Sequence, residues 1–234
     1  MIETEEGLDA DLALQYYSRL LIAHLLLPLL LKSEHPRVVS IFAANKEGVL
    51  TTKDLESEFH ENFTRIGAQS AVITMTTLSF EELAKEYQTV TFCHAYPGGV
   101  NTDILQKLLD TAKGWWKYPA TAFRWLVAPW LFYFVLHLTP EEAGERQLFN
   151  CTSGKYRAGA AKEGDKGGAV GLIDGLKVAT PTVIEDGEGN GVYRTNWNNE
   201  VFPDKKLLAK YREDGFGTLA WRHTLAVFDR VLGK

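Results

Sequence analysis

The chain has 234 residues, a formal net charge of −5 and a sequence pI of about 5.7, with 45% hydrophobic and 24% charged residues. That length suits one sizeable globular domain. The acidic balance gives no electrostatic basis for binding nucleic acid or an anionic membrane. Nucleic acid is therefore not expected as a partner.

Cysteine usage and the start of the sequence bear on the compartment. Cys93 and Cys151 are the two cysteines, and Cys93 falls in a predicted buried strand, which argues against a disulfide framework. Met1 is followed by Ile-Glu-Thr-Glu-Glu, which has neither the basic start nor the apolar run of a signal peptide. A cytoplasmic protein is expected.

The first long element is a helix expected over Leu8–Lys32. Asp9 or Asp11 can cap its start, and nearly every residue of Leu20–Leu31 is apolar. A helix that is apolar on nearly every side is expected to be buried on nearly every side. A membrane span is the alternative, which the short length and a kink at Pro28 disfavour.

A strand, a helix and a second strand are expected next, and they make a parallel crossover unit. Arg37–Phe42 is apolar without alternation, as in a strand covered on both faces. A polar loop, Ala43–Phe63, leads to a helix over Thr64–Tyr87, which has apolar residues near one face. The second strand contains Val90 and Phe92.

The second strand ends in a turn that organises the rest of the chain. Pro97 cannot donate to a sheet ladder, and Gly98 with Gly99 permits backbone angles closed to other residues. Thr102 can then cap a new helix. Open α/β sheets place their ligand where a strand ends in such a turn.

The remaining elements follow this turn. Trp115–Leu138 is rich in tryptophan and is interpreted as a lid over an apolar pocket, a packed helix pair or a patch on a membrane surface. A helix is expected over Thr139–Thr152, a surface loop over Lys155–Asp186 and a short strand over Gly191–Asn196. Lys205–Gly233 supplies amphipathic helices, broken near a Gly-Phe-Gly triplet.

Two side chains near the end of the second strand are candidates for acid–base chemistry. His94 and Tyr96 are two residues apart and therefore on one face of a strand. The alternative is that both are hydrogen-bonded core residues. No metal site is expected.

The order of these parts resembles the C-terminal two thirds of the short-chain dehydrogenase/reductase superfamily, and the tail is most like a fungal subgroup. The most specific match is P-G-x-V-x-T at Pro97, Gly98, Val100 and Thr102, which in the family lies against the nicotinamide end of NAD(P). The resemblance implies an NAD(P)-dependent oxidoreductase acting on an apolar small molecule.

The resemblance also implies the fold class. We expect an α/β protein with a partial Rossmann-like parallel sheet and extra helices. Residues 1–234 would form one incomplete domain, with a helical lid or substrate segment over residues 103–152 and C-terminal helices over residues 203–234.

The family's chemical machinery is not found. The G-x-x-x-G-x-G turn that holds the cofactor pyrophosphate has no counterpart in the sequence. The tyrosine and lysine of the family's Y-x-x-x-K fall on Gln69 and Ile73, the serine falls near Ala43, and the asparagine falls on Gln15. Redox activity is therefore expected to be impaired. The alternatives are a non-redox isomerase, dehydratase or cyclase, and a non-catalytic protein.

The strand Arg37–Phe42 is expected to be a sheet edge beside an incompletely covered leucine-rich helix. Three arrangements would cover this region. These are a homodimer through helices 9–32 and 64–87, a partner protein, and a start upstream of Met1 that supplies a nucleotide-binding half.

Overall fold

The structure is a computed structural model, and it describes residues 3–50, 65–102, 130, 138–161, 165 and 167–233. It divides into two units, Met1–Tyr96 with Asn150–Lys234, and Pro97–Phe149. Each unit is described by itself. The expected segment Trp115–Leu138 lies outside the described residues except for Trp130 and Leu138.

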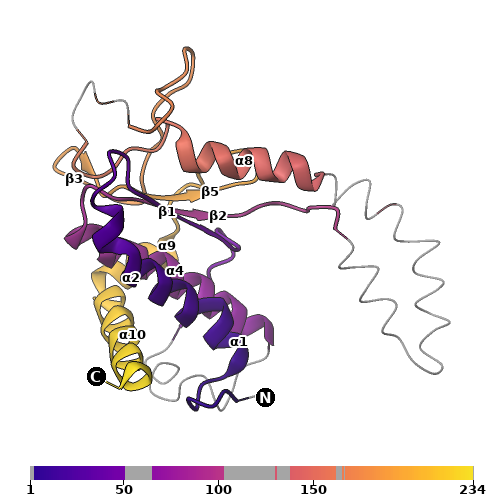
Figure 1. Cartoon of the computed structure of the whole chain (residues 1–234), viewed down its shortest axis with the longest axis vertical. Helices are drawn as coiled ribbons and strands as arrows, with labels where there is room; N and C mark the ends of the chain where they lie inside the picture. The colour runs from indigo at the N-terminus through magenta and orange to yellow at the C-terminus, as the bar shows by residue number, and fades with distance from the viewer. Residues whose placement is uncertain are drawn as a thin grey trace. The chain divides into compact units, whose positions relative to one another are not determined.

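The first unit is built on a parallel sheet of three strands in the order β1-β2-β5. The strands are β1 (Arg37–Ile41), β2 (Thr91–Ala95) and β5 (Val192–Thr195), and both pairings are parallel. The α/β class and the partial Rossmann-like sheet expected from the sequence are confirmed (Figure 1).

One face of this sheet carries the helices. They are α1 (Ala10–Leu12), the π-helical turn η1 (Ala13–Tyr17), α2 (Ser18–Leu30), α4 (Arg65–Glu86), α9 (Lys206–Glu213) and α10 (Phe216–Leu232). Val38, Phe92 and Val192 point to this face and pack with the helices in one hydrophobic core. Gly215, with φ +67°, separates α9 from α10 at the expected break.

The first helix differs from its prediction. Tyr16, Leu20 and Leu27 are buried against the core, but Leu14 and Leu29 are 70% and 61% exposed. The expectation of burial on nearly every side was wrong, because among the described residues the helix is covered on its core side and exposed on the other. Residues Ala10–Leu30 are long and apolar enough to cross a membrane by length and composition, properties that core helices share.

The other face of the sheet is covered by the segment that the sequence predicted as a surface loop. A hairpin of β3 (Ile184–Glu185) and β4 (Glu188–Gly189) begins at the end of this segment. Tyr156 is fully buried, with its ring 5.3 Å from that of Tyr193. The guanidinium of Arg37 donates to the carbonyl oxygens of Tyr156 and Gly167 in this segment and to those of Asn150 and Ser153 just before it. This region is therefore partly core, which its glycine-rich composition concealed.

The second unit contains the turn after β2 and most of α8 (Pro140–Thr152). Thr139 Oγ1 accepts a hydrogen bond from the amide of Glu142 at 3.1 Å, and acidic residues follow in the first turn. The predicted start of this helix is thus confirmed, and Thr139 adds a side-chain cap to it.

Candidate functional site at the carboxyl ends of the strands

Parallel strands present their carboxyl ends at one edge of the sheet, where ligands bind in open α/β folds. The register aligns Ser40 of β1 with His94 of β2, and His94 with Arg194 of β5. These residues lie on the helix-covered face, because Val38, Phe92 and Val192 are two positions earlier on their strands. A row of polar side chains therefore crosses the sheet near its ligand end.

His94 is fully buried within this row. Its Nδ1 lies 2.9 Å from Thr77 Oγ1 of α4, and its ring stacks on Phe42 with a centroid distance of 6.3 Å. Burial lowers the pKa of His94 to about 4, although the nearby Glu47 carboxylate acts in the opposite direction. The imidazole is consequently neutral at pH 7.

Glu47 and Arg194 form a buried ion pair beside His94. Glu47 Oε1 lies 3.0 Å from Arg194 Nη1, and both side chains are fully buried. Lys205 Nζ lies 3.0 Å from Glu47 Oε2 and donates to the Asn45 carbonyl oxygen at 2.7 Å. Burial alone would raise the pKa of Glu47, but the Arg194 charge and the Lys205 hydrogen bond hold it below its usual value.

This network joins the loops that follow β1 and β5. Arg194 also donates from Nη2 to the Pro203 carbonyl oxygen, so one guanidinium contacts both loops. A buried charge pair of this kind is costly to break from one side. No sequence pattern indicated this network, since Glu47 stands in a stretch predicted as a polar loop.

The second candidate of the pair, Tyr96, follows β2 and is half-buried. Its amide donates to the Thr195 carbonyl oxygen at 2.8 Å, which extends the sheet by one bond. His94 and Tyr96 are thus both held by the sheet, His94 within it and Tyr96 just beyond its end.

The predicted cofactor residues Pro97, Gly98, Val100 and Thr102 lie in the second unit. Gly98 has φ +80°, the left-handed conformation that the sequence predicted for this turn. Val100 forms a parallel bridge with Leu138, and the Asn101 amide donates to the Leu138 carbonyl oxygen at 2.8 Å. Pro97, Gly98 and Val100 are half-buried and Thr102 is exposed. The helix expected after Thr102 lies outside the described residues.

The residues that align with the family's catalytic asparagine, tyrosine and lysine lie on helices of the first unit. Gln15 lies in the π-helical turn, Gln69 is exposed and Ile73 is buried. Tyr16 is fully buried with its hydroxyl 2.8 Å from both Ser79 Oγ and Thr224 Oγ1. Burial raises the pKa of Tyr16 to about 12, so this phenol is a structural hydrogen-bonding group at neutral pH.

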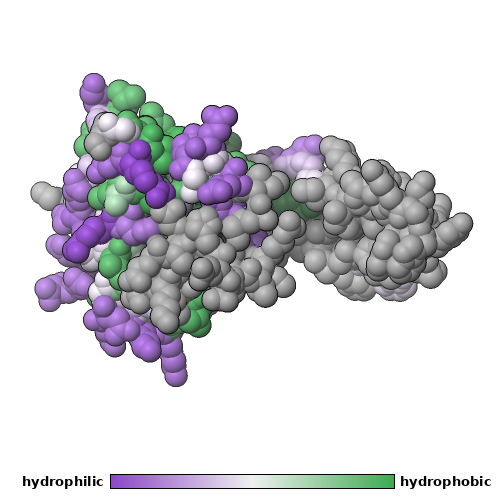
Figure 2. All heavy atoms as spheres, turned by 90° about the horizontal axis from the view of Figure 1, so that it is seen from below, coloured by the Kyte–Doolittle hydropathy of each residue, from purple (hydrophilic) through white to green (hydrophobic). Residues whose placement is uncertain are grey.

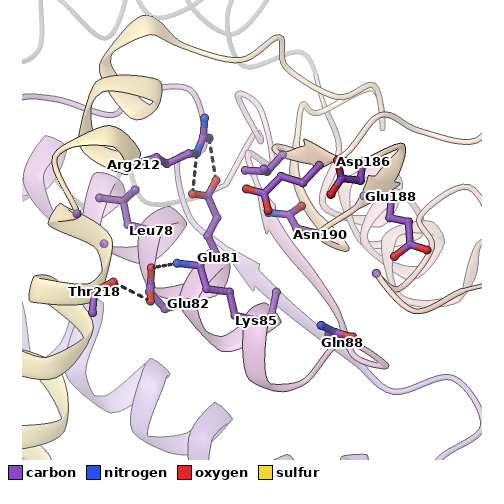
Figure 3. Close-up of a pocket in the computed structure, with 17 residues that line it drawn as sticks. Leu78, Glu81, Glu82, Lys85, Gln88, Asp186, Glu188, Asn190, Arg212 and Thr218 are labelled. Atoms are coloured by element: carbon purple, nitrogen blue, oxygen red, sulfur yellow. Dashed lines mark hydrogen bonds and ion pairs between the residues drawn. The ribbon is translucent and has the colours of Figure 1, made fainter.

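A cavity of about 440 Å³ lies toward the other end of the sheet. It is formed by the end of α4, the β3–β4 hairpin and the α9–α10 turn (Figure 3). Arg212 donates to both carboxylate oxygens of Glu81 at 2.9 and 2.8 Å, and Glu82 accepts from Lys85 at 2.6 Å. Its lining comes from these three segments and from Gly159, all distant in sequence, which explains why no local sequence pattern indicated it.

Within the residues that the structure describes, no group of three or more His, Cys, Asp or Glu side chains is arranged to hold a metal ion.

No protein-family model matches the chain. It is similar to the oxidoreductase AN1596 of Emericella nidulans, at 38% identity over 235 residues that cover 99% of this chain and 65% of that protein. The oxidoreductase andH of Emericella variicolor is 32% identical over 234 residues, covering 99% of this chain and 64% of its own length. The short-chain dehydrogenase/reductase SAT2 of Stachybotrys chartarum is 27% identical over 240 residues, covering 99% and 61%.

These relatives are fungal and are named as oxidoreductases, which supports the resemblance drawn from the sequence. The chain spans somewhat less than two thirds of the length of each of them.

Proposed function

We propose that this chain is part of a short-chain dehydrogenase/reductase-like oxidoreductase that uses NAD(P) and acts on an apolar small molecule. The observation that carries the proposal is similarity to fungal oxidoreductases over 99% of the chain, together with a parallel sheet whose central strand ends in the P-G-G-V-N-T turn. The sheet and turn are the features that the resemblance requires.

The described residues would suit the nicotinamide half of NAD(P) better than its pyrophosphate. The turn at Pro97–Thr102, with Gly98 in the left-handed conformation, would hold the nicotinamide end. A pyrophosphate needs free backbone amides, and the Gly48 amide after β1 is already bonded to Ser70 and Thr74. When bound, NAD(P) would supply the hydride-transfer chemistry.

Proton transfer is the step for which this chain is poorly equipped. His94 is neutral with a pKa of about 4, and Tyr16 has a pKa of about 12, so neither exchanges a proton readily at neutral pH. Gln69 and Ile73 stand at the family's tyrosine and lysine positions and cannot titrate there. We therefore propose slow redox turnover by this chain, with cofactor binding as its more readily measured property.

Cofactor binding is tested by titrating the full chain with NADPH and NADH and following nicotinamide fluorescence. We expect saturable micromolar binding that Gly98→Val weakens by about tenfold or more, since a β-branched residue is strained at positive φ. Gly175→Val is the matched control, because Gly175 also has positive φ (+85°) and lies in open space within the first unit. Absence of binding by the unaltered chain, or equal weakening by both variants, would refute the proposed site.

A further inference from the structure

The cavity of about 440 Å³ at the end of α4 lies apart from the residues proposed to hold the cofactor. Gln88 and Asn190 line it and stand just before β2 and β5, so it lies at the amino ends of these strands. Its described lining includes no residue of β1 or of the first helix, Ala10–Leu30. Its volume is that of a site for a small molecule, for which about 300–1,000 Å³ is usual.

The floor of the cavity is apolar. Leu78 and Ala84 of α4 line it and are 1% and 2% exposed, so the cavity reaches the hydrophobic core. A Cβ at Gly215 would have no heavy atom within 4 Å, so the α9–α10 turn leaves space on its side. Figure 2 shows hydrophobic side chains at the surface of the described residues, interleaved with hydrophilic ones. The cavity has the same mixture within it, and its floor would accept methylene groups.

The α4 side of the cavity carries cationic side chains that are already paired. Arg212 donates to both carboxylate oxygens of Glu81, and it also donates to both of Asp204 at 2.8 and 3.0 Å. Two carboxylates therefore share one guanidinium. Lys85 Nζ lies 2.6 Å from Glu82 Oε1 and is paired in turn. These pairs leave an excess of negative charge beside the apolar floor.

The β3–β4 hairpin contributes carboxylates that have no counter-ion. Within the described residues, the side chains of Glu185, Asp186 and Glu188 have no ion pair or hydrogen bond, and all three are exposed. Glu185 and Glu188 are direct partners across the hairpin, an arrangement in which like charges repel. A cation bound between them would relieve this repulsion.

The placement of the carboxylates indicates the kind of cation. Figure 3 shows Asp186 and Glu188 on the hairpin, and Glu81 and Glu82 on α4 across the cavity from them. In the described part of the chain, no three acidic side chains are arranged to hold one metal ion. A cation whose charges are separated by a hydrocarbon chain fits both the charged walls and the apolar floor.

We propose that this cavity binds a linear aliphatic polyamine. One ammonium group contacts the carboxylates of Glu185 and Glu188, another contacts Glu82, and the methylene chain between them lies over Leu78 and Ala84. The proposal does not depend on redox activity or on cofactor binding.

The proposal is tested by isothermal titration calorimetry of the full chain with spermidine. We expect micromolar binding, at least about tenfold tighter than the binding of methylamine or of Mg²⁺. Methylamine carries a single charge and Mg²⁺ has no hydrocarbon chain, so each lacks one of the features that the cavity would recognise. Added salt should weaken the binding of spermidine, because the hairpin carboxylates are exposed.

Two double variants locate the site. Glu185→Gln combined with Glu188→Gln removes the facing charges of the hairpin and should weaken the binding of spermidine about fivefold or more. The matched control combines Asp174→Asn with Asp229→Asn, which removes as much charge from exposed positions outside the described lining, and it should change the binding less than about twofold. All four side chains are exposed, so circular dichroism should show that both double variants are folded.

Four results would overturn the proposal. The first is no binding of spermidine by the folded chain. The second is equal weakening by the two double variants, which would show a general effect of net charge. The third is binding of Mg²⁺ as tight as that of spermidine, which would assign the carboxylates to a metal ion. The fourth is a lysine-rich peptide that displaces spermidine and binds at least about tenfold tighter, which would assign the cavity to a basic polypeptide.

Discussion

The two edges of the sheet are finished in different ways. At β5 the Val192 carbonyl accepts from the Thr182 amide and the Arg194 carbonyl accepts from the Phe202 amide, both at 2.8 Å. The Val192 amide in turn donates to Asn190 Oδ1 at 3.1 Å. At β1 the described residues supply one comparable contact, from Arg19 to the Ile41 carbonyl.

Within the described residues, loops close the β5 edge, whereas the Val39 backbone groups at the β1 edge have no hydrogen-bond partner. Closure at β5 uses the loops directly before and after the strand, and the loop after it is tied to the Glu47–Arg194 pair because Arg194 donates to the Pro203 carbonyl oxygen. The β1 edge has apolar side chains beside it, among them Ile22, Leu26 and Ile41. The following predictions test this contrast, beginning with the largest effect.

The largest loss of stability is expected from Glu47→Gln, which leaves Arg194 charged and buried without its counter-ion. The free energy of unfolding should fall by about 3–5 kcal/mol. Glu200→Gln is the control, because Glu200 pairs with Lys155 while remaining 65% exposed, and it should cost at most about 1 kcal/mol. Urea denaturation followed by circular dichroism measures both. Similar losses for the two variants would mean that the buried pair does not hold the β5 side.

The first helix has a core side and an exposed side. Leu27→Ala removes a fully buried side chain and should cost about 2–5 kcal/mol, as core leucine truncations do. Leu29→Ala changes a side chain that is 61% exposed and should stay within about 0.5 kcal/mol of the unaltered chain. The same denaturation experiment applies. A large cost for Leu29→Ala would show that this side is covered in solution.

Acid should destabilise the fold through His94. Its folded pKa of about 4 lies below its ordinary value of 6.5, so the unfolded state binds the proton more readily between these values. Stability should therefore fall as pH drops from 6.5 to 4, by a total on the order of 3 kcal/mol. At lower pH, protonation of Glu47 breaks its ion pair with Arg194. Because the pKa of Glu47 is lowered in the folded state, the unfolded state binds this proton more readily, and stability falls further.

Unfolding free energies measured across this pH range test the assignment. His94→Asn should flatten the slope between pH 6.5 and 4, while His35→Asn, at a position outside the network, should retain it. An unchanged slope in His94→Asn would place the acid sensitivity elsewhere.

A smaller effect is expected at the closed edge itself. Asn190→Ala removes the acceptor of the Val192 amide and should cost about 1–2 kcal/mol. Asn198→Ala removes the acceptor of the exposed Glu200 amide, where water can substitute, and should cost about 0.5 kcal/mol or less. Thermal unfolding resolves the two. Equal effects would argue that the β5 edge is not sealed more firmly than an ordinary loop.

The sequence predicted the elements whose patterns are local. The strands at Arg37 and Val192, the helix from Arg65 and the left-handed turn at Gly98 all follow from runs of apolar residues and from glycine chemistry. Burial of Tyr156 and the exposed side of α2 were missed, because both depend on which distant segments cover them.

The candidate site was predictable only in part. His94 and Gly98 were found because they end a strand, a position that the sequence reveals. Glu47, Arg194 and Lys205 come together from three separate loops and strands, and no spacing rule connects them. Their pairing is a consequence of the sheet order, which brings β5 next to β2.

Amide hydrogen exchange at the two edges tests the central claim most directly. We predict strong protection of the Val38 amide, which is bonded within the sheet, and of the Val192 amide, which is bonded to Asn190, and fast exchange of the Val39 amide. A Val39 amide that exchanges as slowly as that of Val38 would contradict it, because the β1 edge would then already be covered.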